Sequence, residues 1–523
     1  MKKYLHVLFL STTALFIGFL AGCGTPQDTN ENVLAPPLSE DNLHDRELIF
    51  LMPSDPVSID PMAANHIGTA QVARQIFDGL FMFDDEGNVV PNLVETYEMQ
   101  DDGSWVFTLR QGIYFHDGSY FTSEAVRLTI ERLIDTERAW PTTFILNMVE
   151  SVEEIDTYTV RFVTYFPFAP LPAHLTHSAT YPMSPEMLRQ EADGNFEVGE
   201  NPIGTGPFRF VSRDYGSSIT MERNPYHWRN IPYVDTLTFL VVPEPTVRFN
   251  MIYAGEAHAT FAEPTDIQFV EDNEDISLIW VDPHQMNYIG FNTSIAPWDN
   301  YLLRRAVAYA INRENILYAA QEGLGVLGVA PIPPNVVGAP ENVIHSGIDL
   351  DYSRSLLEQA GFPDGLTADL HITGGNVWQT IAAPYVQSSL AEIGIDLNIV
   401  VHEFGGFAQH IQAGTHTGLF LATWSTVSQD ADYALFPLFH RDNQFRATRF
   451  YDERLEELLV QARQTTDLAT RSVLYEEIVE GLVFYSPMVV LFYPSMALLT
   501  TGTEGTVIRV GTSPYFHSTR FIR

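Results

Sequence analysis

Apolar and polar positions alternate clearly between residues 105 and 110, a pattern that begins at Trp105. This two-residue period is typical of a strand with one buried face. An Asp-Gly turn signal at 117–118 follows, and Thr-Ser-Glu at 122–124 is typical of a helix start. Apolar residues then recur at helical spacing at Ala125, Val126 and Ile130. The segment therefore predicts a strand, a turn and a helix.

A strand–helix–strand unit is predicted between residues 366 and 401. The first strand covers 366–373, a Gly-Gly turn follows, and the helix covers 378–393 and ends at Gly394. Alternating apolar residues over 395–401 predict the second strand. Because a helix joins the two strands, we expect them to be parallel with a right-handed crossover.

Three more segments have the spacing of amphipathic helices. Their apolar positions are Leu303, Ala306, Val307 and Ala310 after Asn300, then Leu455, Leu458, Leu459 and Ala462, and last Leu474, Ile478 and Leu482. Strand and helix patterns thus alternate along the chain, which predicts a mixed α/β fold.

The N-terminal segment has a basic start, an apolar run from Tyr4 to Leu20, and then Cys23, which is the only cysteine. This order is typical of a bacterial lipoprotein signal, which is removed before the cysteine that receives lipid. The alternative, a membrane-spanning helix, needs roughly 20 apolar residues, which is more than the run offers. We expect a signal peptide at 1–22, lipid on Cys23 and a flexible tether at 23–45.

The composition is that of a large acidic protein. Of 523 residues 45% are hydrophobic, which is enough for more than one core, so two or three lobes are expected. The net charge is −38, and both lysines stand at positions 2 and 3. Such a field disfavours nucleic acid and anionic lipid as partners. An acidic surface is also typical of a saline or alkaline habitat, so the charge does not identify a ligand.

Catalytic signatures are missing from the sequence. It has no Gly-x-Ser-x-Gly elbow, no His-Glu-x-x-His zinc helix and no phosphate loop. The Gly-rich stretch at 204–207 ends in Pro207, which lacks the backbone donor that a phosphate loop needs, so we interpret it as a tight turn. A carboxylate pair for glycoside hydrolysis stays open, because 66 acidic residues always offer a pair and nothing selects one.

Histidines give only a weak indication of a metal site. His174 and His177 are three residues apart, and His402, His410 and His416 lie within one region. Partner cysteines are missing, and 16 histidines will cluster by chance. We therefore expect neither a metal site nor a cofactor.

The stretch DDGSWVFTLRQGIYFHDG at 101–118 resembles the signature of the family 5 extracellular solute-binding proteins, which are the peptide, nickel and glutathione receptors of ABC importers. Further blocks resemble the family in the same order, from about residue 46 to the end. These blocks are FDGL at 77–80, 121–126, 202–208 with 223–225 and Trp228, 291–293, RRAVAYAINR at 304–313, and 356–362.

The resemblance implies a type II periplasmic-binding-protein fold, an α/β architecture of two lobes with a cleft between them and an extra subdomain. By analogy lobe I covers 46–283 and is completed by 498–523, with the extra subdomain at about 88–198. Lobe II covers 284–497. The two passages of the chain between the lobes form a hinge, and the solute is held in the cleft.

The family binds its solute without changing it. Peptide-binding relatives treat the ligand as an added strand and hold its termini by charge. In them a Trp followed three residues later by Asp contacts the ammonium, but the matching residue here is Val427, which carries no charge. The pattern over 424–439 is instead similar to the glutathione-type branch.

The resemblance implies ligand contacts on both lobes. Those on lobe II are Trp424, its neighbours Thr423 and Ser425, the anionic Asp430 and Asp432, and Tyr433. On lobe I, Asn65 and His66 fall at the loop that pairs with peptide backbone. Core packing for Trp424, helix capping for Asp432 and a plain surface loop at 65–66 are the alternatives.

The sequence thus predicts a monomeric substrate-binding lipoprotein, without enzymatic activity, that delivers a short peptide or glutathione to an ABC permease. Its expected place is the cell surface, on the outer face of the cytoplasmic membrane or the periplasmic side. One alternative is a nickel or metallophore receptor of the same fold; the basic residue of nickel-type relatives matches Thr176, with His177 beside it. The other alternative is a surface lipoprotein hydrolase.

Overall fold

The computed structural model describes residues 46–270, 273–340, 347–443, 445–509, 511 and 513–522. The predicted signal peptide, Cys23 and the tether lie outside the described residues.

A seven-stranded sheet is the framework of the first part of the fold. Its strands are β1 (Glu47–Met52), β8 (Phe208–Asp214), β9 (Ser218–Arg223), β10 (Thr236–Val241), β11 (Ala259–Phe261), β12 (Ile276–Val281) and β19 (Met496–Thr501). Their order is β12-β19-β11-β1-β10-β9-β8. β1 pairs in parallel with β10 and β11, and the other neighbours are antiparallel.

A six-stranded sheet is the framework of the second part. Its strands, in the spatial order β14-β18-β13-β17-β15-β16, are β13 (Gln285–Phe291), β14 (Gly325–Leu327), β15 (Leu366–Thr373), β16 (Ile395–His402), β17 (Leu419–Ser425) and β18 (Met488–Pro494). β15 and β16 are parallel, and α10 (Val377–Ala391) connects them. The predicted strand–helix–strand unit is therefore confirmed.

Helices cover both faces of the six-stranded sheet. They are α7 (Tyr301–Ala310), α8 (Arg313–Gln321), α9 (Leu350–Gln359), α11 (Phe404–Ala413), α12 (Ala431–Phe439), α13 (Glu453–Gln464) and α14 (Leu468–Tyr485), besides α10. Along β13, Ile289 packs in the apolar cluster with α7 to α10, whereas Tyr288 packs with α11 to α14. Because both faces are covered, all seven residues of β13 are buried. The three helices predicted from apolar spacing are confirmed as α7, α13 and α14.

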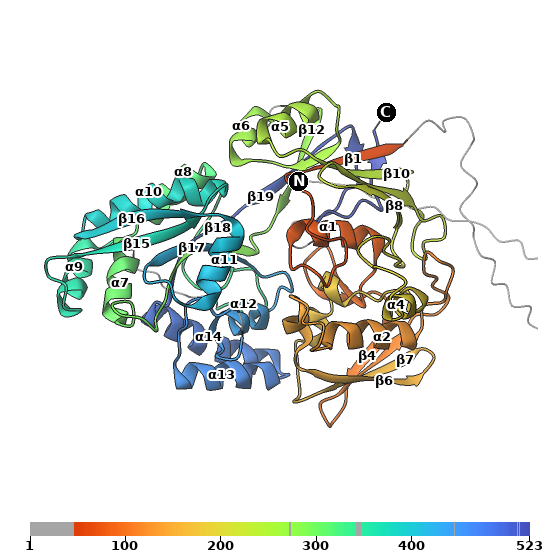
Figure 1. Ribbon diagram of the computed structural model, residues 1–523, viewed down its shortest axis with the longest axis horizontal. Coiled ribbons are helices and arrows are strands. Elements are labelled where there is room, and N and C mark those ends of the chain that lie inside the picture. Colours follow the sequence, from red (N-terminus) through yellow and green to blue (C-terminus); the bar gives the residue numbers. More distant parts are fainter. Residues whose placement is uncertain are drawn as a thin grey trace, which may run out of the picture. The chain divides into compact units, whose positions relative to one another are not determined.

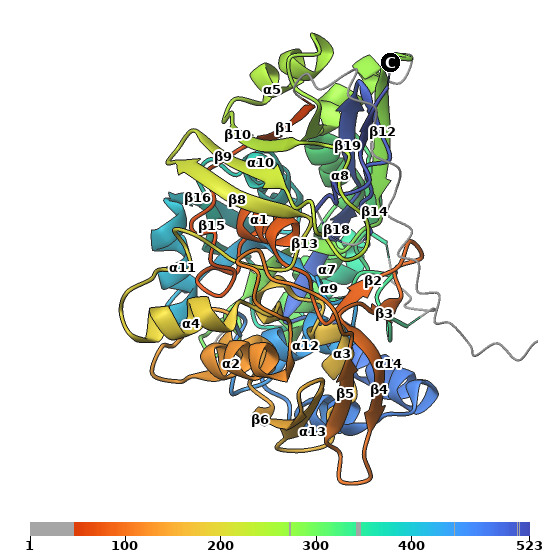
Figure 2. The same cartoon turned by 90° about the vertical axis from the view of Figure 1, so that its right-hand side faces the viewer.

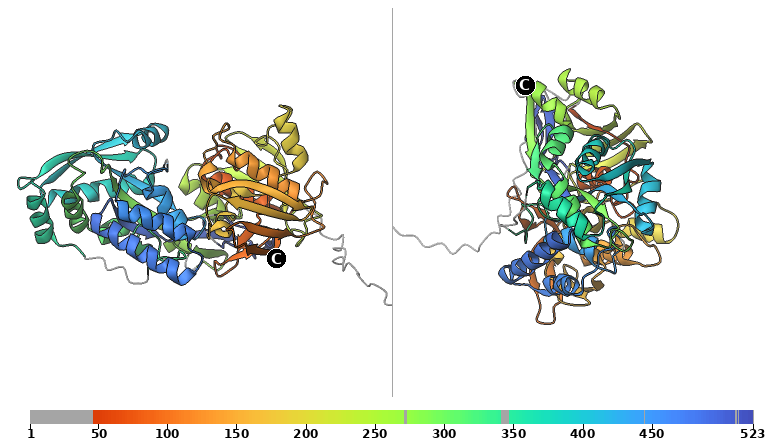
Figure 3. Two further views of the ribbon diagram at one scale, coloured as in Figure 1. Left: turned by 90° about the horizontal axis from the view of Figure 1, so that it is seen from below. Right: turned by 90° about the vertical axis from the view of Figure 1, so that its left-hand side faces the viewer.

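A four-stranded antiparallel sheet, ordered β4-β5-β7-β6, belongs to the first part of the fold. It consists of β4 (Val94–Met99), β5 (Trp105–Leu109), β6 (Val149–Asp156) and β7 (Thr159–Thr164). Helix α2 (Ser123–Ile134) covers one face and buries Ala125, Val126 and Ile130 (Figures 1 and 3). The strand and the helix predicted for this segment are confirmed.

Shorter elements complete the described chain. They are α1 (Ile67–Ile76), α3 (Leu171–His174), α4 (Pro185–Ala192), α5 (Pro245–Tyr253), α6 (Ile267–Val270), the 3₁₀ helices Thr143–Leu146, Ser178–Thr180 and Pro264–Asp266, and the two-stranded pairs β2 (Phe81–Phe83) with β3 (Val89–Pro91) and β20 (Thr503–Glu504) with β21 (Arg520–Phe521).

The chain passes between the two large sheets twice, at 282–284 from β12 to β13 and at Ser495 from β18 to β19. We call the part built on the seven-stranded and four-stranded sheets lobe I, and the part built on the six-stranded sheet lobe II. β12 and β19 are antiparallel neighbours in lobe I, and β13 and β18 are antiparallel neighbours in lobe II (Figure 2). The two passages therefore form a narrow connection, which we call the hinge. The subdomain limits given above stay predictions.

The Gly-rich stretch at 204–207, predicted as a tight turn, bends at 205–207 and approaches the end of α1. The Gly206 nitrogen donates to the Ile76 carbonyl over 2.9 Å. A Cβ on Gly206 would lie 2.5 Å from the Ile76 carbonyl carbon. The glycine is thus needed because two backbones touch.

We predict that Gly206→Ala destabilises lobe I by about 1–3 kcal/mol, because the added methyl has to displace backbone. Chemical unfolding followed by circular dichroism measures this. Gly406→Ala is the control, since a Cβ there meets no atom within 4 Å and alanine favours a helix. Equal stability of wild type and Gly206→Ala would contradict this, because it would show that the backbone at Ile76 moves aside at no cost.

Candidate functional site

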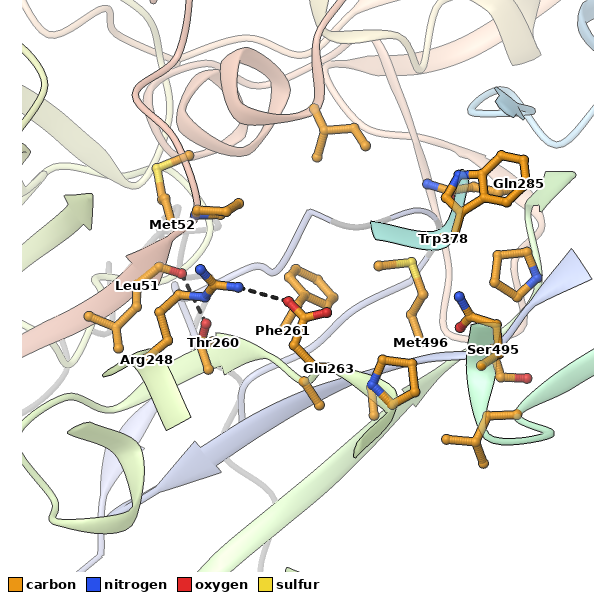
Figure 4. A pocket seen from close by; sticks show the side chains of 18 of the residues that line it. Leu51, Met52, Arg248, Thr260, Phe261, Glu263, Gln285, Trp378, Ser495 and Met496 are labelled. Carbon is orange, nitrogen blue, oxygen red and sulfur yellow. Dashed lines mark hydrogen bonds and ion pairs between the residues drawn. The ribbon is translucent and has the colours of Figure 1, made fainter. Parts of the chain in front are cut away.

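A cavity of about 370 Å³ lies between the lobes, beside the hinge. Lobe I contributes the end of β1, the start of α1 and the segment 260–267, and lobe II contributes parts of β13, β17 and α10. The hinge residue Ser495 and the first residue of β19, Met496, also line it (Figure 4). Its volume is within the range of about 300–1,000 Å³ that is usual for small-molecule sites.

Two charged side chains of lobe I line one wall of the cavity. Arg248, on α5, is buried, and its Nη2 donates to Oε1 of Glu263 over 2.8 Å (Figure 4). Its Nη1 donates to the carbonyls of Val242 and Pro243. Glu263 remains 34% exposed. Burial raises the pKa of Glu263, although Arg248 opposes this. The wall thus offers a fixed cation and an accessible carboxylate.

Aromatic and polar side chains complete the lining. Trp378, at the start of α10, lies across the cavity from Arg248 and Glu263 (Figure 4). Phe261 and Trp280 of lobe I add apolar surface, and Asn287 of β13 adds an amide. A ligand with a charged end and an apolar body therefore finds a matching environment here.

Of the eight predicted ligand contacts, Thr423 and His66 line the cavity. The Thr423 hydroxyl donates to Oδ1 of Asn287 over 2.6 Å across the β13–β17 pair. His66 is the N-cap of α1, where its Nδ1 accepts from the Gly68 nitrogen over 3.2 Å. Partial burial lowers the pKa of His66, which favours the neutral imidazole.

Trp424, Tyr433 and Asn65 form a different contact between the lobes. The Trp424 indole donates to the Tyr433 carbonyl over 3.2 Å and stacks on its ring. Asn65 of lobe I is hydrogen-bonded to the side chain of Tyr433, which is fully buried. Phe144 of lobe I packs against Tyr433 at 5.9 Å between ring centroids. These residues connect the lobes directly.

Asp430 and Asp432 both have cationic partners within the protein. Asp430 is the N-cap of α12 and forms a buried ion pair with Arg471. The cap is thus Asp430 and not Asp432. Asp432 pairs with Arg463 at 2.9 Å and meets Nε2 of His174, on α3 of lobe I, at 3.2 Å. Burial alone would raise the pKa of Asp432, but Arg463 and His174 lower it to about 2.

The remaining predicted positions lie close to these contacts. Ser425 pairs with Gln285 in the β13–β17 ladder and is half-buried. Val427 packs against the apolar core of lobe I. Thr176 is buried and donates to the Ala173 carbonyl, while Nδ1 of His177 accepts from the Ala179 nitrogen.

Sequence reasoning missed Arg248, Glu263, Trp378 and Trp280. Arg248 and Glu263 lie on segments without a family motif, 176 and 161 residues before Trp424 in the chain. One signal was available: Glu263-Pro-Thr-Asp266 has the spacing of a capping box, which the structure contains. That signal places Glu263 at a helix start and does not indicate a cavity.

Four histidines lie together in lobe II. His402, His410 and His416 are joined by His371, whose Nδ1 is 2.9 Å from Nε2 of His402. Among the described residues no three His, Cys, Asp or Glu side chains are arranged to hold a metal ion. Burial, then neighbouring imidazoles, lower the pKa of His371 to about 4, and also that of His416, to which Arg449 contributes.

We predict that this cluster makes stability depend on pH. The unfolded histidines protonate near pH 6.5, whereas His371 and His416 in the folded state resist until about pH 4. Stability is therefore complete above about pH 6.5 and falls as the pH drops toward 4. Urea unfolding from pH 7.5 to 4.5 measures the slope. The double variant His371→Asn/His416→Gln should have a shallower slope, and an unchanged slope would exclude the cluster as its source.

Comparisons with known proteins agree with this geometry. Residues 88–446 match the model of "Bacterial extracellular solute-binding proteins, family 5 Middle". The glutathione-binding protein GsiB of Pectobacterium atrosepticum is 27% identical over 457 residues, which cover 85% of this chain and 88% of that protein. GsiB of an Escherichia coli strain is 28% identical over 442 residues, covering 82% and 86%.

Solved structures share the fold. The periplasmic binding protein DppA from Helicobacter pylori, in complex with the peptide STSA, has a TM-score of 0.82 at 25% identity and covers 91% of this chain and 98% of its own. NikZ from Campylobacter jejuni, in complex with Ni(L-His), has a TM-score of 0.79 at 20% identity, with 91% and 98% covered. The predicted two-lobed type II fold is confirmed. The chain belongs to the bacterial extracellular solute-binding proteins of family 5.

Proposed function

We propose that the protein captures a small peptide-like solute, such as glutathione or a di- or tripeptide, in the cavity between its lobes and delivers it unaltered to an ABC permease. The observation that carries the proposal is the cavity at the hinge, with Arg248 and Glu263 on one wall and Trp378 on the other. The names of its relatives, glutathione-binding GsiB and the peptide complex of DppA, support the solute class.

The charged wall suits the two ends of a peptide-like solute. Glu263 accepts hydrogen bonds from the ligand's ammonium, and Arg248 attracts a carboxylate, each in a partly dehydrated site where charge-assisted hydrogen bonds are strong. Thr423, Asn287 and His66 are placed for main-chain contacts, and Trp378 for the apolar body. The cavity of about 370 Å³ is too small for a long peptide.

The other predicted contacts hold the closed form in this proposal. Asn65, Trp424 and Tyr433 join the lobes, Asp432 meets His174 across them, and Ser425 supports the β13–β17 ladder. Asp430 orders α12 through its ion pair. Val427 stands where peptide-binding relatives have the Asp that contacts the ammonium, and in this proposal Glu263 on the cavity wall provides the carboxylate.

The cellular setting follows from the sequence. Lipid on Cys23 would hold a monomeric, non-catalytic body on the outer face of the cytoplasmic membrane, within reach of a permease. In the described part of the chain every helix is too short or too polar to span a bilayer.

We predict that Glu263→Gln weakens binding of glutathione or a dipeptide such as Met-Leu by about tenfold, which is about 1.4 kcal/mol. Isothermal titration calorimetry measures the affinity, with Ni²⁺ as a further ligand. Glu457→Gln, a change of the same type on the exposed surface of α13, should leave binding unaltered. Tight Ni²⁺ binding without any peptide or glutathione binding would favour the metallophore alternative, and product formation would favour the hydrolase.

Trp424→Ala should weaken solute binding more than it weakens folding, because Trp424 is half-buried and packs between lobes rather than deep in one of them. Calorimetric affinity and thermal unfolding of the same preparation separate the two effects. Loss of both in equal proportion would make Trp424 a core residue, which is the interpretation that this test is meant to exclude.

A further inference from the structure

A second, smaller cavity lies within lobe I, outside the set of residues that line the solute cavity. Its volume is about 40 Å³. It is enclosed by the second half of α1, the loop after β9 and, near the C-terminus, Arg509, Tyr515 and His517. Its charged and polar lining includes Arg74, Asp78, Tyr181, Arg229, Arg509 and His517. Three arginines around so small a space are unexpected in a chain of net charge −38.

Arg74 is the least compensated of these arginines. Only 7% of it is exposed, and its Nη1 donates to the Tyr515 hydroxyl over 2.7 Å. Among the described residues no carboxylate lies within ion-pair distance of it, and its Nε has no hydrogen-bond partner. A buried cation without a counter-charge is costly.

Other buried arginines of this chain have their charge balanced by a carboxylate or their donors satisfied by backbone carbonyls. Arg471 forms its ion pair with Asp430. Arg304 has no carboxylate partner but donates to four backbone carbonyls, those of Trp298, Asp299, Tyr485 and Ser486. Arg74 has neither arrangement, and it faces the cavity instead.

Asp78 and Asp85, which lie near the cavity, already have partners within the protein. Asp78 accepts hydrogen bonds from Thr205 and Trp228 and lies 3.5 Å from His227. Asp85 pairs with Nε of Arg509 at 3.0 Å but is itself 74% exposed. Nη1 of Arg509 is buried and has no partner in the described structure. Among the residues that line the cavity, three arginines therefore stand against one carboxylate, that of Asp78.

We propose that this cavity binds a small inorganic anion of the size and charge of chloride. In this measure a water molecule needs about 10–15 Å³, so 40 Å³ holds a halide ion with one or two waters and excludes an amino acid. The anion compensates Arg74 and Arg509 together. It thereby ties α1 to the C-terminal segment that completes lobe I, independently of any solute between the lobes.

Thermal unfolding in different sodium salts tests the proposal. Sodium concentration is kept constant, so that screening of the acidic surface is the same, and gluconate is exchanged stepwise for chloride or bromide. We expect the melting temperature to rise by a few degrees and to saturate, as for a ligand that binds only the folded state. General salt effects predict the opposite order, since weakly hydrated halides are not excluded from protein surfaces as strongly hydrated anions are.

Two variants separate site binding from general electrostatics. Arg509→Gln should abolish the saturable response while the protein still folds, because this residue is at the partly exposed edge of the cavity. Arg454→Gln removes an equally charged side chain from the exposed pair with Glu477 on lobe II, and it should respond to chloride as wild type does. An equal response of both variants would overturn the proposal.

Crystals soaked in bromide give the direct test. An anomalous peak within hydrogen-bonding distance of the Arg74 guanidinium is the expected result. Density for water alone in this cavity, together with identical melting curves in gluconate and chloride, would overturn the proposal. Neither result bears on solute capture, which the titrations with glutathione and dipeptide decide separately.

Discussion

The buried carboxylate of Asp432 is the interaction on which the contact between the lobes depends. A carboxylate at 2% exposure is tolerated only with a matching cation, and Arg463 of the same lobe provides one at 2.9 Å. His174 approaches the same group from lobe I. The Ala169 nitrogen of lobe I also donates to the Arg463 carbonyl. Both the guanidinium and the backbone carbonyl of Arg463 thus contribute to the contact between the lobes.

Because side chains are packed at this contact, the free space between the lobes lies beside the hinge. Tyr433, Phe144, Trp424 and Val427 fill the region between the lobes with packed side chains. Thr423, the neighbour of Trp424 on β17, lines the cavity, because successive residues of a strand point to opposite faces. Position 427 holds valine and not a carboxylate, whereas the cavity wall contains the carboxylate of Glu263. An apolar residue stands at position 427 among the packed side chains, and a charged wall lines the cavity.

Regular elements were predictable because their signals are local. Alternation at 105–110, the Gly-Gly turn after residue 373 and helical spacing from Leu455 each depend on neighbours within a few residues, and all three are confirmed. The type II fold was predictable because the family blocks recur in order. The glycines of 204–207 were interpreted as a turn, since the sequence does not show that α1 ends against them.

The candidate site was only partly predictable. Thr423 and His66 were found because they adjoin motifs. Arg248 and Glu263 become neighbours of the cavity only when α5 packs beside β19, a contact between segments about 250 residues apart. Asp430 and Asp432 have the chemistry of ligand contacts, but Arg471 and Arg463, which engage them, come from helices 30 to 40 residues later. Residue type alone does not reveal such partners.

Ser495 is the single residue between β18 of one lobe and β19 of the other, and it also lines the cavity between the lobes. One of the two connections between the lobes is therefore also part of the cavity wall. Any rotation of the lobes about the backbone torsion angles of Ser495 changes the shape of that wall. The angle between the lobes and the volume of the cavity are thus coupled through this residue.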